Sequence, residues 1–232
     1  MEAKKIIATA VHVYTSLGLL FAFTAALALV TSDVRLFFVS LWLTIVIDST
    51  DGLLARHFGV KEILPHFDGR RLDDLIDFIT YVFLPCVALV VFDVLPPAWG
   101  WAAVLPLLAS AYGFSQDNAK TEESFVGFPS YWNVVILYLY VLTPPTWVSV
   151  VLLLILSLSV FIPIHYIYPS KTQWLKRTTL PLTGVYGIVY GVVCFYLNAE
   201  WAKALTLVSL AYPAYYLLVS LAYHRRIRFA EQ

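Results

Sequence analysis

The sequence has little charge, few cysteines and no long polar segment. Of its 232 residues 13% are charged, and 15 Lys and Arg balance 15 Asp and Glu, so the formal net charge is zero. Such a chain has no excess of basic residues with which to bind nucleic acid, and we expect no nucleic-acid partner. Cys86 and Cys194 lie inside apolar runs without the spacing of metal ligands, which indicates that both are packing residues.

Apolar residues, by contrast, make up 60% of the chain, and the mean hydropathy is +0.78. This composition is typical of a polytopic membrane protein. The first apolar run, from about Ile6 to Val30, is too long for a cleaved signal peptide and is expected to remain as a helix. No soluble domain, internal repeat or low-complexity tract is visible, so we expect one all-α integral membrane domain over residues 1–232.

Eight apolar segments have about the length of helices that cross a bilayer. They cover residues 7–30, 34–55, 72–95, 98–115, 129–143, 145–166, 180–198 and 201–223. Turn residues separate several of them, including "TSD" at 31–33, "PPAWG" at 96–100, "TPP" at 143–145 and "NAE" at 198–200. The sequence therefore predicts about eight transmembrane helices.

The basic residues fall almost entirely on one side of these predicted helices. With eight spans, the side that carries both termini holds Lys4, Lys5, Arg56, Lys61, Arg70, Arg71, Lys120, Lys171, Lys176, Arg177, Arg225, Arg226 and Arg228. The other side holds only Arg35 and Lys203. Because Lys and Arg accumulate in cytoplasmic loops, both termini are predicted to be cytoplasmic.

Carboxylates gather where two of the predicted helices meet this cytoplasmic side. Asp48 and Asp51 are three positions apart at the end of the second helix, and Asp73 and Asp77 are four apart at the start of the third. Each pair shares one helix face, so adjacent antiparallel helices can bring all four carboxylates together. A single Asp at such a position is most simply an interfacial charge, but two spaced pairs favour a built site.

Four converging carboxylates repel one another, which indicates a compensating cation. Oxygen ligands favour magnesium, manganese or calcium, with a bridging phosphate completing the coordination. Small residues fit this picture, because Gly52 and Ala55 leave room beside Asp51 and Gly69 permits a turn or cap before the third predicted helix. Arg56 offers a positive partner for a phosphate. Asp68 and Asp74 lie off the shared faces and are expected to be solvated or capping charges.

The same residues carry a family resemblance. The order Asp, two residues, Asp-Gly, two residues, Ala-Arg, a spacer, Gly, three residues, Asp, three residues, Asp is the signature of the CDP-alcohol phosphotransferase family. Its positions are occupied in turn by Asp48, Asp51, Gly52, Ala55, Arg56, Gly69, Asp73 and Asp77. The spacer of twelve residues, 57–68, is longer than in most of the family and resembles that of the bacterial phosphatidylcholine synthases. Three further stretches resemble those enzymes, namely "VHVYTSLG" at 11–18, "LDDLIDFITYVFLP" at 72–85 and "FVGFPSYWN" at 125–133.

The resemblance implies an enzyme in which an alcohol hydroxyl attacks the lipid-side phosphorus of CDP-diacylglycerol and releases CMP. Choline would be the alcohol, manganese or magnesium the cofactor, and the bacterial inner membrane the location, with the site facing the cytoplasm. The implied metal ligands are Asp48, Asp51, Asp73 and Asp77, and Asp77 is also the implied general base. The implied CDP and pyrophosphate contacts are Thr15, Gly52, Ala55, Arg56 and Gly69. The family also implies a homodimer.

Choline carries a quaternary ammonium group, which aromatic faces and carboxylates recognise. Candidates near Asp77 on the cytoplasmic side are Tyr81, Glu122, Glu123, Phe128, Tyr131 and Trp132. Tyr81 stands one helical turn beyond Asp77 on the same predicted face. Aromatic residues at a membrane interface serve more often as anchors or packing residues, and this alternative stays open for each aromatic candidate.

Other functions remain open from the sequence. Within the family the acceptor can instead be serine, glycerol 3-phosphate or an inositol phosphate, although a phosphorylated acceptor calls for more basic residues than these spans offer. An ion-coupled carrier also concentrates carboxylates in a membrane, but usually near the bilayer midplane and often within internal repeats. A non-catalytic membrane scaffold is the third alternative.

Overall fold

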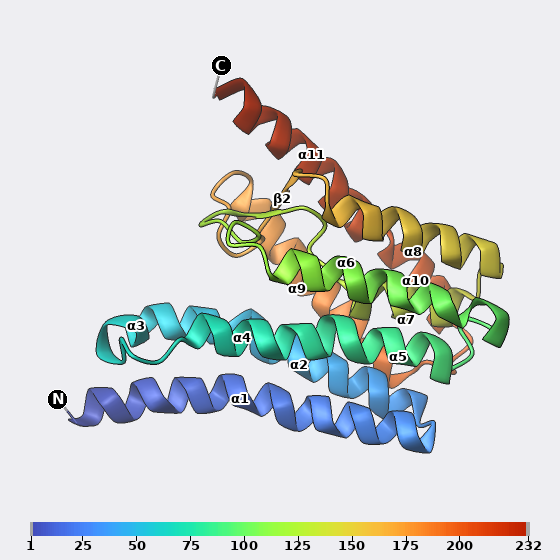
Figure 1. Ribbon diagram of the computed structural model, residues 1–232, viewed down its shortest axis with the longest axis horizontal. Helices are drawn as coiled ribbons and strands as arrows, with labels where there is room; N and C mark the ends of the chain where they lie inside the picture. Colours follow the sequence, from blue (N-terminus) through green and yellow to red (C-terminus); the bar gives the residue numbers. More distant parts are fainter. Residues whose placement is uncertain (1, 231–232) are drawn as a thin grey trace.

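The computed structural model describes residues 2–230 and is almost entirely helical (Figure 1). The first half contains α1 (Glu2–Thr31), α2 (Val34–His57), α3 (Val60–Ile63), α4 (Gly69–Asp77), α5 (Leu84–Val91) and α6 (Val104–Phe114). The second half contains β1 (Ser124–Val126), α7 (Trp132–Leu142), α8 (Thr146–Val160), β2 (His165–Ile167), α9 (Lys176–Phe195), α10 (Ala202–Ser209) and α11 (Ala211–Ala230). The predicted all-α class is confirmed, apart from the short strands.

Helix boundaries follow local capping chemistry. Asp33 closes the turn between α1 and α2, where its side chain accepts a hydrogen bond from the backbone N–H of Leu36 at 2.9 Å. Asp68 does the same for α4, accepting from the N–H of Arg71 at 3.0 Å, which confirms its expected capping role. Gly59 is the N-cap of α3 and has a φ of +58°, a conformation that glycine adopts without strain, and the long spacer thus contains a short helix.

Five helices within residues 2–230 are long and apolar enough to cross a membrane. They are Glu2–Thr31, Val34–His57, Gly69–Val91, Lys176–Phe195 and Ala202–Phe229. Large apolar side chains on their outer faces are exposed, among them Val30 at 83% and Val208 at 71%. Such exposure suits a lipid environment, since hydrocarbon chains replace water as the solvent. The protein is thus an integral membrane protein, while the total of eight spans stays a prediction, because α7 and α8 are shorter apolar helices.

The predicted span at 145–166 is wrong at its C-terminal end. Helix α8 stops at Val160, and His165–Ile167 forms strand β2, which pairs antiparallel with β1. In this pair Phe125 lies opposite Tyr166. Pro163 cannot donate a backbone hydrogen bond, and β-branched and aromatic residues favour extended structure, so the run leaves the helix although it remains apolar.

A π-helical segment, Phe78–Phe83, joins α4 to α5 within one long helix. The wider turn alters the angular spacing of the side chains that follow Asp77, and π-helical turns often occur at functional sites. Tyr81 lies in this segment and is buried, with 8% of its surface exposed.

Figure 1 shows α1 along the bottom of the view, α4 and α5 above it, and α6, α8 and α11 higher still, while α2 packs on α1. The described start of α1 and α3 lie at the left of the view and the end of α11 at the upper left, whereas the connections from α1 to α2 and from α7 to α8 lie toward the right. One large apolar core, which includes Phe37, Phe38, Leu41, Trp132 and Leu153, fills the space between the helices. The acidic ends of α2 and α4 are thereby brought to the end that also carries the strands.

Candidate active site

The acidic motif forms two overlapping groups of carboxylates. Oxygen atoms of Asp48, Asp51 and Asp73 all lie within 4.8 Å of one another, and so do oxygen atoms of Asp73, Asp74 and Asp77. The first group joins the end of α2 to α4, as the spacing of the motif predicts. Asp73 belongs to both groups and is their shared member.

The first group has the donor set of a hard divalent cation. Its ligands are oxygens only, and Asp51 is just 6% exposed, so solvent screens the repulsion between the three carboxylates poorly. Magnesium and manganese prefer such oxygen donors, and a divalent ion would remove the repulsion. These residues therefore fit the expected metal cofactor. Thr15 borders the same small space and is buried, and its contact with a pyrophosphate stays a prediction.

Asp48 receives a second interaction from the π-helical segment. The hydroxyl of Tyr81 donates a hydrogen bond to Oδ2 of Asp48 at 2.6 Å. This hydrogen bond holds Oδ2 of Asp48 toward the long helix that contains α4 and α5. A short charge-assisted hydrogen bond of this kind orients the carboxylate. Tyr81 thus supports the acidic cluster as well as facing the neighbouring cavity.

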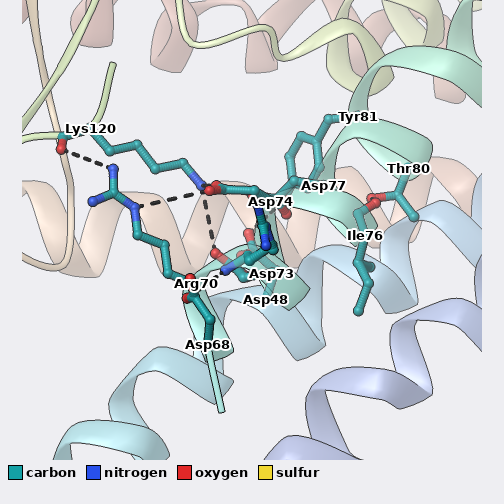
Figure 2. A network of polar contacts seen from close by, with 11 residues as sticks. Asp48, Asp68, Arg70, Asp73, Asp74, Ile76, Asp77, Thr80, Tyr81 and Lys120 are labelled. Carbon is teal, nitrogen blue, oxygen red and sulfur yellow. Dashed lines mark hydrogen bonds and ion pairs between the residues drawn. The ribbon is translucent and has the colours of Figure 1, made fainter. Parts of the chain in front are cut away.

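Lys120 enters the second group of carboxylates from the loop between α6 and β1 (Figure 2). Its ammonium Nζ lies 2.6 Å from Oδ1 of Asp74, 3.1 Å from Oδ2 of Asp77 and 3.6 Å from Oδ2 of Asp73. Burial lowers the pKa of Lys120, but Asp77, Asp73 and Asp74 together raise it above its ordinary value, so the ammonium stays charged.

The sequence did not predict a role for Lys120. Its only distinguishing feature was its place in a polar loop, and most lysines in such loops are solvated. Asp74 was expected to be a solvated or capping charge. That expectation is wrong, since Asp74 binds Lys120 closely and is approached at 4.0 Å by Nε of Arg70. The loop that carries Lys120 lies more than forty positions further along the chain, and no local pattern predicts that contact.

A cavity of ≈ 280 Å³ opens beside the carboxylates. Asp48, Asp77 and Lys120 contribute to one part of its wall. Its aromatic lining consists of Tyr81, Phe114, Phe125, Phe128, Tyr131 and Tyr168. The cavity thus combines carboxylates with aromatic rings, the two kinds of group that bind a quaternary ammonium ion.

Three of the predicted acceptor residues, Tyr81, Phe128 and Tyr131, line this cavity, and three do not. Trp132 is 2% exposed and donates its indole N–H to Oγ of Ser110 at 2.7 Å, so it belongs to the helix core. The carboxylate of Glu123 accepts a hydrogen bond from the Tyr223 hydroxyl at 3.1 Å. Glu122 is exposed and lies outside the cavity wall.

Three aromatic residues of the lining, Phe114, Phe125 and Tyr168, were not foreseen. Phe125 and Tyr168 stack with ring centroids 4.6 Å apart, joining β1 to the segment after β2. The ammonium of Lys171 lies 4.2 Å from the centroid of the Tyr168 ring. Tyr168 is therefore already engaged by two neighbours, and the pairing of the strands places it here.

The remaining predicted residues lie at the end of α2 and at the start of α4. Arg56 is exposed at the end of α2 and forms no ion pair within residues 2–230. A Cβ atom on Gly52 would lie 3.4 Å from Nη1 of this arginine. Ala55 packs against the small apolar cluster that contains Val11. Arg56 is thus the residue of this group most open to an anionic ligand.

Gly69 does not form the turn that was predicted as one reason for a glycine there, while its contact with CDP stays a prediction. It is the first residue of α4, and its φ is not in the positive range, so no turn demands glycine there. A Cβ atom would instead lie 2.7 Å from Cε1 of His12. Glycine therefore leaves room for the His12 ring where α1 approaches α4.

Known proteins of the same kind resemble the chain over most of its length. No family model matches it. A phosphatidylcholine synthase of Legionella bozemanae is 37% identical over 78% of this chain and 88% of its own. One from Legionella pneumophila is 38% identical over 78% of this chain and 75% of its own, and one from Borreliella burgdorferi is 33% identical over 93% and 94%. With this similarity and the complete acidic motif, the chain belongs to the family of bacterial phosphatidylcholine synthases.

Proposed function

We propose that the protein transfers the phosphatidyl group of CDP-diacylglycerol to choline, giving phosphatidylcholine and CMP. The observation that carries this proposal is the carboxylate cluster at the wall of an aromatic-lined cavity, in a chain of this family. The cluster suits a diphosphate neutralised by a cation, and the cavity suits a quaternary ammonium ion. The two substrates would therefore meet at Asp48 and Asp77, which line the cavity and belong to the cluster.

The proposed metal ligands are Asp48, Asp51 and Asp73, with Asp77 close enough to Asp73 to join them. Magnesium or manganese is the proposed ion, since the donors are all carboxylate oxygens. When bound, such an ion would neutralise negative charge on the diphosphate and on the CMP leaving group. The chain's own part is to hold the carboxylates at this spacing, which the Tyr81 hydroxyl does for Asp48.

Asp77 is the proposed general base. Its carboxylate is 9% exposed and borders both the cavity and the small space among Asp48, Asp51 and Asp73. It would accept the proton of the choline hydroxyl as the choline oxygen bonds to the lipid-side phosphorus. The bond between that phosphorus and the bridging oxygen breaks at the same time, and CMP leaves with the electron pair.

Tyr81, Phe128 and Tyr131 are the proposed contacts of the trimethylammonium group. They offer rings within the cavity wall, and Asp48 and Asp77 add negative charge nearby. The arrangement places the hydroxyl end of a bound choline at the carboxylates and its cationic end among the rings. Serine, with a smaller and hydrogen-bonding ammonium group, gains less from such a wall.

On the donor side, Thr15, Gly52, Ala55, Arg56 and Gly69 are the proposed contacts of the CDP group. Arg56 supplies an unpaired positive charge at the end of α2. Burial lowers the pKa of Lys171, and repulsion from the neighbouring cations Arg56 and Lys120 lowers it further. Three basic side chains therefore lie near one another beside the carboxylates. A diphosphate would relieve this repulsion.

We also propose the finer topology that the charge pattern predicts. The single domain would cross the bacterial inner membrane eight times, with both termini and the site at the cytoplasm. The described start of α1 and end of α11 both lie toward the left of the view, away from the connections from α1 to α2 and from α7 to α8, which supports this arrangement (Figure 1). A homodimer is proposed on the family resemblance alone.

The deciding experiment measures CMP release by the purified protein in detergent. CDP-diacylglycerol and manganese are supplied with choline, serine, glycerol 3-phosphate or inositol in separate reactions, and Asp77→Asn is the blank. Choline-dependent CMP release that the blank lacks supports the proposal. Turnover with another alcohol alone would contradict the acceptor, and no turnover by folded protein with any alcohol would contradict the transferase.

A further inference from the structure

Lys120 is held in place from its backbone as well as from its side chain. Its carbonyl oxygen accepts a hydrogen bond from Nη2 of Arg70 at 3.4 Å, and the residue forms a bridge with Phe125. The N–H of Val126 donates to the carbonyl of Ala119 at 2.9 Å, which closes the loop onto β1. The side chain is only 21% exposed. A surface lysine without a role would point into solvent, because burial of its charge costs free energy.

The contacts of the ammonium group leave one oxygen of Asp77 free. Lys120 donates to Oδ2 of Asp77, whereas Oδ1 takes part in no hydrogen bond with the described residues. Asp77 borders both the cavity and the small space among Asp48, Asp51 and Asp73, and Oδ1 is the oxygen that no described residue holds. In Figure 2 the lysine side chain reaches across from the loop to the carboxylates of α4.

We propose that Lys120 is a positioning residue for the transfer reaction, which holds Oδ2 of Asp77 so that Oδ1 can take the proton of the acceptor hydroxyl. This inference rests on the proposed function. Without the ammonium group, the Asp77 side chain can rotate about its Cα–Cβ and Cβ–Cγ bonds, and the free oxygen spends less time in reach of the hydroxyl. Loss of the ammonium group therefore lowers the rate of the chemical step, since proximity and orientation govern that rate.

A purely structural role for Lys120 makes a different prediction. Its shortest contact is with Asp74, and that ion pair alone can anchor the loop to α4. If anchoring were the whole role, Asp74→Asn would impair the enzyme as much as loss of the lysine. If Lys120 acts through Asp77, Asp74→Asn should be much milder, because the bond to Asp77 remains.

The test uses Lys120→Cys, assayed before and after alkylation. Treatment with 2-bromoethylamine restores an ammonium group at nearly the length of lysine, whereas iodoacetamide adds a neutral group. Cys86 and Cys194 are both buried, so treated wild type controls for alkylation elsewhere. Lys61→Cys, at an exposed position of α3, is the matched control for a lost lysine. Steady-state assays give kcat and KM separately for choline and CDP-diacylglycerol.

We expect Lys120→Cys to lower kcat about 100-fold, and Asp74→Asn to lower it no more than about fivefold, because a positioned base contributes on this scale. KM for CDP-diacylglycerol should change little. Aminoethylation should restore most of kcat, and carboxamidomethylation should not. Recovery within one preparation also shows that the variant is folded.

Three results would overturn the inference: an unchanged kcat in Lys120→Cys, equal recovery with either reagent, or an equal loss in Asp74→Asn. If Lys120→Cys yields no folded protein, Lys120→Arg decides, since it keeps the charge. Its kcat should then exceed that of Asp77→Asn, and a kcat equal to that of Asp77→Asn contradicts the inference. Absence of choline-dependent turnover in the wild type would instead contradict the proposed function.

Discussion

Asp73 is the residue on which both carboxylate groups depend. It lies within 4.8 Å of members of each group and faces Lys120 at 3.6 Å. Removing its charge alters the proposed metal site and the lysine contact together, whereas its neighbour Asp68 serves only as an exposed helix cap. The two aspartates stand five positions apart and provide a matched pair.

We predict that Asp73→Asn lowers choline-dependent CMP release by on the order of 100-fold or more, since a metal ligand is lost. Manganese should raise the melting temperature of the wild type and raise that of the variant less, because ligand binding stabilises the folded state. Asp68→Asn should behave as wild type in both measurements, as Asn also caps helices well. Equal manganese shifts in the two variants would contradict the proposed ligand.

Tyr131 tests the acceptor cavity. Tyr131→Leu removes an aromatic face, and we expect KM for choline to rise about 2- to 30-fold, the range of a cation–π contact worth roughly 0.5–2 kcal/mol. KM for CDP-diacylglycerol should stay unchanged, because the ring lies in the acceptor cavity. Tyr196→Leu, at a 58% exposed position beyond α9, is the control. Equal changes in both KM values would mean that Tyr131 supports the fold rather than choline.

At the scale of elements, the two strands matter because they carry aromatic residues to the cavity wall. Gly127 follows β1 with a φ of +82°, and a Cβ atom there would lie 2.2 Å from the carbonyl oxygen of Val160. The end of α8 and the strand therefore meet backbone to backbone. This packing brings Phe125 and Phe128 into the cavity lining.

We predict that Gly127→Ala lowers stability by about 2 kcal/mol or more, from the strained φ and the clash with Val160. Its melting temperature in detergent should fall clearly. Gly184→Ala is the matched control, because nothing lies within 4 Å of its Cβ position and alanine favours a helix. A Gly127→Ala protein as stable as wild type would show that the strand can move away from α8.

At the scale of the whole molecule, the charge asymmetry makes a topology prediction. Lys61 in α3 should face the cytoplasm, and Asn198 in the connection after α9 should face the opposite side. In cells with a permeabilised outer membrane, a membrane-impermeant maleimide should label Asn198→Cys, but label Lys61→Cys only after lysis. Buried Cys86 and Cys194 should give little background. The reverse pattern would contradict the proposed orientation.

Much of this molecule was predictable from local features. The turn at Asp33, the cap at Asp68 and the length of the first two helices follow from capping and hydropathy, which act over a few residues. The four motif aspartates were recognisable because helical spacing places each pair on one face. The end of α8, the π-helical turn and the strands were missed, since these depend on what the chain packs against.

The sequence by itself determined that the protein belongs in a membrane and that the carboxylates of Asp48, Asp51, Asp73 and Asp77 come together, because these are consequences of apolar length and short-range spacing. Only the tertiary structure decided which distant residues complete the site. It joined Lys120 to Asp74 and Asp77 across 46 and 43 positions, and it placed Phe125 at the cavity while leaving Trp132 in the core. Such contacts arise from how helices and strands pack, and no local pattern of residues encodes them alone.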